Sequence, residues 1–249
     1  MTLALSSIEV PVASCVCATA AVSVRGLGKT IDDRDILDDL TFEVPEGSFV
    51  ALLGANGAGK SSLLKILATL IPPSRGELQL FGAAVRSDAT ALRSRIGLIG
   101  HAPMLYRDLS ALENLILFGR LYGVADPRQR AEQLLDYVEL SHRASDSIKT
   151  FSRGMVQRAA IARALMHDPD LLLADEPFSG LDAPSANALE RLLKRLHDEG
   201  RTIILANHDL SQSLAIAQRA IVLRRGRLVM DAPVGDLTQA EILAEVSAT

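Results

Sequence analysis

The sequence predicts an α/β fold, in which a parallel sheet is covered by helices and interrupted by an inserted helical lobe. Two observations support this prediction. Short apolar runs recur along the chain, and several lack polar interruptions, which is typical of strands buried on both faces of a parallel sheet. Between residues 102 and 150 the pattern becomes amphipathic with helical spacing instead. The apolar runs span residues 21–24, 49–53, 78–81, 96–99, 171–174, 202–206 and 220–223.

One of these runs leads directly into a glycine-rich segment. Residues 54–61 match the pattern G-x-x-x-x-G-K-[ST] and follow the run 49–53 without a gap. A strand that ends here must turn tightly around an anion and feed a helix, expected over residues 62–68, whose N–H groups point at that anion. An ordinary glycine-rich turn is the alternative, but the strand before and the helix after argue against it. The sequence therefore predicts a site for a nucleoside triphosphate.

The residue types in this segment suit a phosphate group. Glycines let the backbone approach phosphate oxygens where a side chain would collide. Lys60 supplies a positive charge for the β- and γ-phosphates, and Ser61 offers a hydroxyl to Mg²⁺. The residues expected to bind the nucleotide are Gly54, Ala55, Asn56, Gly57, Ala58, Gly59, Lys60, Ser61 and Ser62.

Another apolar run ends in two carboxylates. Asp175 and Glu176 follow the run 171–174, and an acid at the carboxyl end of such a strand points into the crevice where ligands of open α/β sheets bind. We expect Asp175 to hold Mg²⁺ through water. We expect Glu176 to polarise the water that attacks the γ-phosphate. A surface turn before Pro177 is the alternative, and the presence of the phosphate loop makes it the weaker one.

Capping residues predict the starts of helices in the lobe. A capping box at residues 110–113 opens one helix. Asp126 followed by Pro127 opens another, which we expect to extend to about Leu140. A third helix is predicted over residues 159–166.

Composition excludes several classes of protein. The chain has 249 residues, of which 48% are hydrophobic and 22% charged, and a formal net charge of −4, as in globular proteins. Its densest basic cluster, residues 224–227, lies between two apolar runs and is interpreted as a hairpin turn, so we expect no nucleic-acid partner. No stretch of about 20 apolar residues is present, and the chain is therefore not expected to span a membrane.

Residues 1–20 are small and apolar, but they include Glu9 and Pro11 and lack any Lys or Arg. Because a secretory signal needs a basic start, we interpret them as an N-terminal extension. Both cysteines, Cys15 and Cys17, fall in this extension, and no other Cys or His completes a metal set with them. A cytosolic compartment fits this cysteine usage.

The order of the motifs resembles that of the ATP-binding subunits of ABC transporters. After the phosphate loop and the helical lobe come a Ser-x-Gly helix start at residues 152–154 and the Asp-Glu pair. These are followed by Ser-Gly-Leu-Asp at residues 179–182 and by a late His208. The resemblance covers roughly residues 21–232.

This resemblance implies a P-loop NTPase fold of the ABC ATPase type, forming a single domain over residues 21–240. Such a domain has a RecA-like core, a β-rich N-terminal part and an inserted helical subdomain, here at about residues 102–165. The resemblance also implies ATP and Mg²⁺ as cofactors, and a second copy of the subunit and a transmembrane permease as partners. The subunit would lie at the cytoplasmic face of the cell membrane and contact the membrane only through that permease.

Functional roles carry over where residues match the family pattern. Ser152 and Gly154 would form a helix N-terminus presented to the γ-phosphate bound by the other subunit of a dimer. Asp182 would lie in the loop that joins the two sites. His208 would hydrogen-bond the γ-phosphate and keep the attacking water aligned with Glu176, so these two residues are the expected catalytic pair.

Three features depart from the family pattern. The signature usually reads Leu-Ser-Gly-Gly-Gln, and here Phe151, Arg153 and Met155 occupy its first, third and fifth places. Arg153 either adds a cation near the triphosphate or points to solvent, and we favour solvent. Ile31 stands where an aromatic residue usually stacks on adenine, so loose base selectivity is expected. His101 stands where a glutamine usually reaches Mg²⁺ and the membrane partner, and it introduces sensitivity to pH.

The cargo is predicted from resemblance alone. Gly-His-x-Pro at residues 100–103, followed by residues 109–115, resembles the ATPase subunit of the haem exporter of cytochrome c maturation, which predicts haem export. A general exporter of drugs, lipids or polysaccharides is the alternative. Soluble ABC-type ATPases that act on DNA or ribosomes form another class, but they carry coiled-coil or zinc insertions or two cassettes per chain. A regulator that binds nucleotide without hydrolysis is the last alternative, and Glu176 and His208 argue against it.

Overall fold

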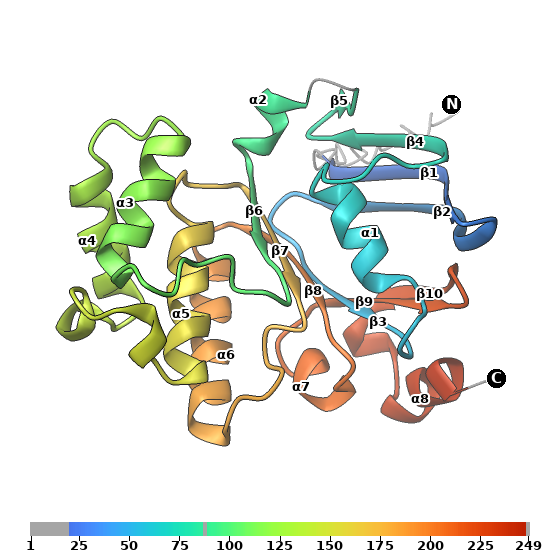
Figure 1. The fold of residues 1–249 in the computed structure, drawn as a ribbon. Helices are drawn as coiled ribbons and strands as arrows, with labels where there is room; N and C mark the ends of the chain where they lie inside the picture. Colours follow the sequence, from blue (N-terminus) through green and yellow to red (C-terminus); the bar gives the residue numbers. More distant parts are fainter. Residues whose placement is uncertain (1–19, 87–88, 248–249) are drawn as a thin grey trace, which may run out of the picture.

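The computed structural model describes residues 20–86 and 89–247 and contains two β-sheets with helices around them (Figure 1). The predicted N-terminal extension, with both cysteines, lies outside the described residues except for Ala20. Ala20 is the first residue of a strand, where it pairs with Pro45.

The larger sheet has the strand order β10-β9-β3-β8-β7-β6. All neighbouring strands in it are parallel except β10, which pairs antiparallel with β9 through the hairpin predicted from the basic cluster. Five of the predicted apolar runs form its parallel strands. The strands are β3 (Phe49–Leu53), β6 (Ile96–Ile99), β7 (Leu171–Asp175), β8 (Thr202–Ala206), β9 (Arg219–Arg224) and β10 (Arg227–Pro233).

The smaller sheet is antiparallel, with the order β2-β1-β4-β5. The other two apolar runs, 21–24 and 78–81, lie in this sheet. An uninterrupted apolar run does not distinguish parallel from antiparallel pairing, so the sequence pattern could not separate them from the strands of the larger sheet. β2 has no uninterrupted run, since it alternates buried apolar residues with exposed polar ones, and it was not predicted. The strands are β1 (Ala20–Ile31), β2 (Arg34–Pro45), β4 (Arg75–Leu80) and β5 (Ala83–Ala84).

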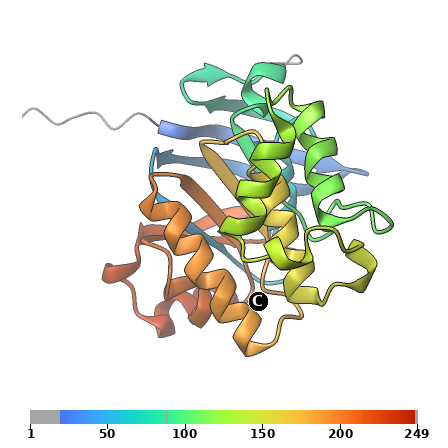
Figure 2. The ribbon, with the colours of Figure 1, turned by 90° about the vertical axis from the view of Figure 1, so that its left-hand side faces the viewer.

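Helices cover the larger sheet on both faces. Figure 2 shows the helical lobe nearest the viewer, with α3 and α4 in green and the long α6 in orange. The helices are α1 (Lys60–Leu67), α2 (Thr90–Arg93), α3 (Ala111–Leu121), α4 (Pro127–Tyr137), α5 (Arg153–Ala164), α6 (Ala183–Asp198), α7 (Leu210–Leu214) and α8 (Gln239–Ser247). Short 3₁₀ turns lie at Ser141–Arg143, Ile148–Thr150 and Val234–Asp236. No helix in the described ranges combines the length and the apolar character that crossing a bilayer requires.

Capping residues behave largely as predicted. Ser110 and Glu113 form a reciprocal capping box at the start of α3. Asp126 caps α4 with Pro127 in the first turn, although the helix ends at Tyr137 rather than near residue 140. The third helix was predicted too short, because it begins at Arg153 and not at residue 159. The Ser152 hydroxyl supplies its N-cap, so the Ser-x-Gly segment is part of the helix itself.

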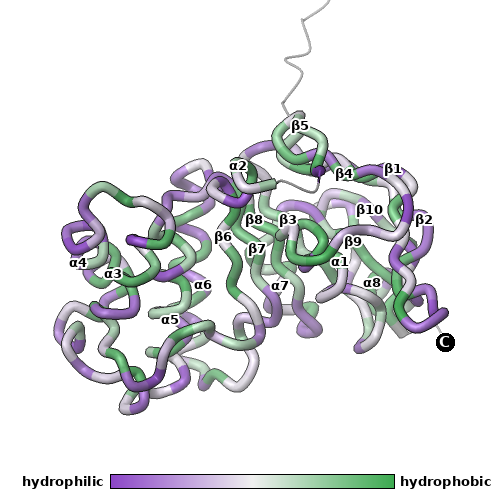
Figure 3. The backbone as a smooth tube through the Cα atoms, turned by 45° about the horizontal axis from the view of Figure 1, so that its top comes forward, coloured by the Kyte–Doolittle hydropathy of each residue, from purple (hydrophilic) through white to green (hydrophobic). Residues whose placement is uncertain are grey.

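Two apolar cores lie on opposite faces of the larger sheet. In β3, Phe49, Ala51 and Leu53 belong to one core with α5, α6 and the helical lobe, and Val50 and Leu52 belong to the other with α1 and the smaller sheet. This alternation explains why the central strands are apolar throughout (Figure 3). The loops at the carboxyl ends of the central strands are thereby held by packing on both sides.

Candidate functional site

The phosphate loop connects β3 to α1, and glycine is required at two of its positions. Gly54 and Gly59 both have positive φ, 148° and 102°, which L side chains rarely adopt. A Cβ at Gly59 would lie 2.5 Å from Leu37 Cδ2, and one at Gly54 would collide with the Leu223 carbonyl. The two ends of the loop, at Gly54 and Gly59, therefore pack closely against neighbouring residues. Its central residues, 55–57, are exposed.

Lys60 lies at the start of α1 with its ammonium group inside the loop. Its Nζ donates hydrogen bonds to the carbonyl oxygens of Gly54, at 2.7 Å, and Ala55, at 3.1 Å. Burial lowers the pKa of Lys60, while the carboxylates of Glu176 and Asp175 act in the opposite direction. A cation is thus held at the place where the sequence predicts a triphosphate.

The two predicted magnesium ligands from the loop and from β7 meet directly. The Ser61 hydroxyl donates a hydrogen bond of 3.0 Å to Asp175 Oδ1, across 114 positions of sequence. Asp175 is the last residue of β7 and is buried, so parallel pairing of β7 and β3 with β8 brings the carboxylate to the loop. Among the described residues, no group of three or more His, Cys, Asp or Glu is arranged to hold a metal. A hydroxyl and one carboxylate fit Mg²⁺, which usually takes few protein ligands together with phosphate oxygens.

Glu176 and His208 come together as the sequence predicts. Glu176 has a φ of 50°, a strained value that typically costs about 1–3 kcal/mol, and it turns the chain away from the axis of β7. Its N–H donates to the Ala206 carbonyl at 2.8 Å, which fixes the turn against β8. Its Oε1 lies 3.6 Å from Nδ1 of His208. A carboxylate and an imidazole at this distance can both hydrogen-bond the same water molecule.

Sequence reasoning missed Asn207, which positions His208. Asn207 is buried, and its side-chain oxygen accepts hydrogen bonds from the backbone N–H groups of His208, at 2.9 Å, and Asp209, at 3.3 Å. Its own N–H donates to the Leu52 carbonyl at 3.3 Å. An Asn after a strand and just before a helix cap is the signal that could have revealed this turn.

A pocket of about 280 Å³ opens over the phosphate loop. It is lined by Ile36, Asn56, Gly57, Gly59, Lys60, Ser61, Ser62 and Glu176. Ile31, predicted to contact the base, lies at the end of β1 with 43% of its surface exposed and does not line this pocket. Ile36 does, and it was not predicted because it lies in the missed strand β2. The contact of Ile31 with a base stays a prediction.

Of the two residues that define the Ser-x-Gly segment, only Ser152 is open to a ligand, because Gly154 packs against another helix. Ser152 is exposed at the N-cap of α5, where its hydroxyl accepts from the Met155 N–H at 3.3 Å. Gly154 is buried against α6, since a Cβ there would lie 2.7 Å from Ser185 Cβ. Arg153 is exposed, as favoured, but its guanidinium lies against Gly180 instead of extending into solvent. No hydrogen bond or ion pair joins this segment to the phosphate loop within the described chain.

Asp182 begins α6 and is tied to the same cluster. Its Oδ1 accepts from the Ser185 N–H at 3.2 Å, and hydrogen bonds from Ser185 hold the pKa of Asp182 below its ordinary value. Because Ser185 also covers Gly154, the starts of α5 and α6 pack directly against each other.

His101 follows β6 and lines a second, larger pocket of about 510 Å³ together with Arg153, Ser179 and Glu176. Within the described residues it makes no hydrogen bond or ion pair, and nothing joins it to Ser61 or Asp175. The structure therefore places His101 near Glu176 but does not bring it to the Ser61–Asp175 pair.

Comparison with known proteins identifies the family of the chain. The sequence profile of the ABC transporter family matches residues 37–179. The chain is 35% identical to the Nod factor export ATP-binding protein I of Cupriavidus metallidurans, over 92% of this chain and 76% of that protein. It is 36% identical to the daunorubicin/doxorubicin resistance ATP-binding protein of Streptomyces peucetius, over 88% of this chain and 67% of that protein. It is 32% identical to the linearmycin resistance ATP-binding protein of Bacillus subtilis, over 84% and 68% respectively.

Solved structures show the same fold. A dimeric ATP-binding cassette in a post-hydrolysis state, bound to ADP and phosphate, aligns with a TM-score of 0.78 and 29% identity, covering 86% of this chain and 98% of that one. An ATP-binding subunit of an ABC transporter aligns with a TM-score of 0.81 and 29% identity, covering 91% and 99%. The fold class predicted from the sequence, a P-loop NTPase of the ABC ATPase type, is confirmed. The chain belongs to the ABC transporter family and is an ATP-binding, ATP-hydrolysing transporter subunit.

Proposed function

We propose that this chain is the ATPase of an exporter whose cargo is an amphipathic drug, lipid or polysaccharide. The observation that carries the proposal is its identity of 32–36% with ATP-binding proteins for Nod factor export and for resistance to two kinds of antibiotic. These relatives favour the general exporter over the haem exporter suggested by residues 100–103. The match spans 84–92% of the chain, so it includes the helical lobe and both pockets.

Hydrolysis follows from the paired groups at the carboxyl ends of β7 and β8. Lys60 and the loop amides hold the β- and γ-phosphates of ATP. Glu176 accepts a proton from the attacking water, and His208 hydrogen-bonds the γ-phosphate beside it. Ser61 and Asp175 would hold Mg²⁺, which supplies charge neutralisation for the phosphate oxygens. Glu176 and His208 also argue against a regulator that binds nucleotide without turnover.

The active unit is a dimer in which each copy completes the site of the other. Ser152 is exposed at the N-terminus of a 12-residue helix, where unpaired N–H groups favour an anion. Asp182 and Gly180 link this surface to the Glu176 turn of the same chain. A dimeric neighbour bound to ADP and phosphate supports this arrangement.

A membrane permease is the second partner, and the pocket beside His101 suits it. Apolar side chains such as Leu105 and Phe151 line that pocket together with Arg107 and Lys149. Met104 and Tyr106, which flank Leu105 in the sequence, are also exposed. Docking there would hold the subunit at the cytoplasmic face of the membrane.

Soluble ABC-type ATPases that act on DNA or ribosomes are less well supported. The segment between residues 102 and 150 folds into two 11-residue helices and 3₁₀ turns, with no coiled coil. Metal clusters of the zinc type are absent from the described residues. Nothing in the lobe therefore provides the insertion that such proteins use.

Reconstitution tests the cargo. The chain and its permease partner are placed in proteoliposomes, and ATP turnover is measured with daunorubicin, with a lipo-oligosaccharide and with haem. We expect the first two to stimulate turnover and haem to have no effect. Glu176→Gln serves as the control, since it should abolish stimulation by any cargo. Stimulation by haem alone would overturn the proposal in favour of the haem exporter.

A further inference from the structure

The turn between β9 and β10 lies between the phosphate loop and the smaller sheet. The Asp38 N–H in β2 donates a hydrogen bond of 2.8 Å to the Gly226 carbonyl in this turn. The Gly226 N–H in turn donates one of 3.1 Å to the carbonyl of Ala58, within the phosphate loop. A continuous chain of backbone hydrogen bonds therefore runs from β2 through the turn to the loop.

Close packing reinforces this connection. A Cβ at Gly226 would lie 2.5 Å from the Ile36 carbonyl oxygen, and a Cβ at Gly59 would lie 2.9 Å from the same oxygen. The backbone of β2 at Ile36 and Leu37 is thus enclosed between the turn and the phosphate loop. A displacement of the turn is therefore expected to disturb the loop, because both segments pack closely against the same stretch of β2.

The turn carries strain that needs support from outside it. Arg225 and Gly226 both have positive φ, 49° and 76°, as in the two-residue hairpin turns that favour Asn-Gly. Arg225 is a poor residue for the first of these positions, since a side chain there meets the backbone. Backbone hydrogen bonds alone therefore hold this turn less firmly than the same bonds would hold an Asn-Gly turn.

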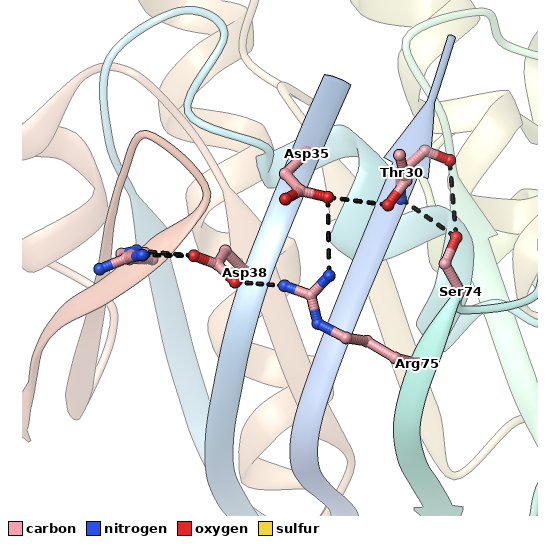
Figure 4. A network of polar contacts seen from close by, with 6 residues as sticks. Thr30, Asp35, Asp38, Ser74 and Arg75 are labelled. Carbon is pink, nitrogen blue, oxygen red and sulfur yellow. Dashed lines mark hydrogen bonds and ion pairs between the residues drawn. The ribbon is translucent and has the colours of Figure 1, made fainter. Parts of the chain in front are cut away.

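A cluster of charged side chains supplies that support. Arg227, directly after the turn, donates a hydrogen bond from Nε to Asp38 Oδ2 at 2.8 Å, and its Nη2 lies 2.6 Å from the same oxygen as an ion pair. Arg75 of β4 holds the other oxygen of Asp38 and reaches Asp35 at 3.6 Å (Figure 4). The Asp38 side chain is 24% exposed, whereas those of Arg227 and Arg75 are 72% and 44% exposed, so solvent screens both pairs at their arginine ends.

We propose that Asp38 is a positioning residue for ATP binding, acting through Arg227 and the Gly226 turn on the amides of the phosphate loop. It contacts no nucleotide itself. Its carboxylate clamps the turn, the turn holds the Ala58 carbonyl, and the loop presents its N–H groups to the phosphates in a fixed geometry. The inference rests on ATP binding by this subunit and is independent of the exported cargo.

The other end of the same hairpin provides a matched control. Arg219 and Asp231 form a bidentate ion pair there, with Nε–Oδ1 and Nη2–Oδ2 distances of 2.6 Å each. This pair joins β9 and β10 with chemistry like that of Asp38 and Arg227, and Arg219 also donates to the Glu43 carbonyl of β2 at 2.7 Å. Neither side chain contacts the Gly226 turn or the phosphate loop through a hydrogen bond or an ion pair in the described chain. Asp231→Ala should therefore lower stability without changing the loop.

Steady-state ATP turnover and calorimetric titration with MgATP test the inference on the purified chain. We expect Asp38→Ala and Arg227→Ala each to raise KM and the MgATP dissociation constant by about ten-fold, equivalent to about 1.4 kcal/mol, with kcat changed much less. The double variant should be no worse than either single one, because both break the same link. Arg227→Lys, which keeps the charge, should recover part of the affinity.

Urea unfolding of every variant separates positioning from general stability. Asp231→Ala should lower the urea midpoint as much as Asp38→Ala does, yet keep the wild-type KM. An equal rise in KM for Asp231→Ala and Asp38→Ala would overturn the inference, and so would a wild-type KM in Asp38→Ala. Additive effects in the double variant would also overturn it. Failure of the wild-type chain to bind MgATP would instead contradict the phosphate site itself.

Discussion

The phosphate loop and the Ser152–Gly154 segment both lie at helix N-termini, but they differ in what surrounds them. The phosphate loop has its functional groups assembled within one chain, and we call it the finished site. The start of α5 exposes its N-terminus, and we call it the open surface. At the loop, Lys60 is buried and Ser61 already meets Asp175, so lysine, hydroxyl and carboxylate are assembled within one chain. At the start of α5, Ser152 is exposed, while Gly154 is used to pack against α6. A helix N-terminus can thus be built either as a finished site or as a surface.

This difference follows from where each helix lies. α1 is enclosed between the two sheets, and its N-terminus faces the crevice at the carboxyl ends of the parallel strands. α5 starts at the edge of the helical lobe, where α6 covers only one side of it. The open surface at Ser152 is consistent with a role towards a second chain, and variants in each region can test this division.

The largest expected effect is at the finished site. Glu176→Gln keeps the size of the side chain but removes its ability to accept a proton. Turnover should fall by about 10²–10⁴-fold, the usual contribution of a general base, while MgATP binding should remain near wild type. Single-turnover hydrolysis and calorimetry on the purified chain measure both quantities. Full activity in this variant would remove Glu176 from the mechanism.

The open surface should respond in a different way. Ser152→Arg places a bulky side chain at the N-terminus of α5, away from the phosphate loop of its own chain. MgATP binding should stay largely intact and turnover should be lost, because the closed dimer cannot form around the nucleotide. Ser152→Ala, which removes only the cap to Met155, is the control and should retain more activity. Equal loss of binding and turnover in Ser152→Arg would contradict a role in the partner's site.

The sequence predicted the finished site more fully than the open one, for a physical reason. The loop, Asp175 and Glu176 lie at the ends of uninterrupted apolar runs, and a parallel sheet necessarily brings such ends together. β2 carries no such run, so its contributions from Ile36 and Asp38 could not be read from pattern alone. Asn207 was missed because its function depends on a turn. The helix start at residues 152–154 was expected from the family resemblance, whereas the apolar pattern alone placed the helix too late, at residue 159.

Residue-level roles remain less accessible than the fold. Gly154 was expected only to face an anion, but its contact with Ser185 involves residues 31 positions apart on two helices. Likewise, the position of Arg153 over Gly180 depends on how the two helix starts pack together. No local pattern encodes such contacts, since they arise from tertiary packing.

The smallest expected effect is on the pH dependence of the free energy of unfolding, through Asp182 at the start of α6. Hydrogen bonds from Ser185 hold the pKa of Asp182 below its ordinary value, so the folded state binds this proton less readily than the unfolded state does. The resulting stability is present above the ordinary pKa of an aspartate, about 3.9, and is lost as pH falls through the lower folded value. In Asp182→Asn the cap remains and the titrating group is gone, because Asn also accepts from the N3 N–H. Urea unfolding from pH 7 down to pH 3 should therefore show wild type slightly more stable at neutral pH, with the difference shrinking in acid. A constant difference across that range would show that the carboxylate charge does not stabilise the junction between α5 and α6.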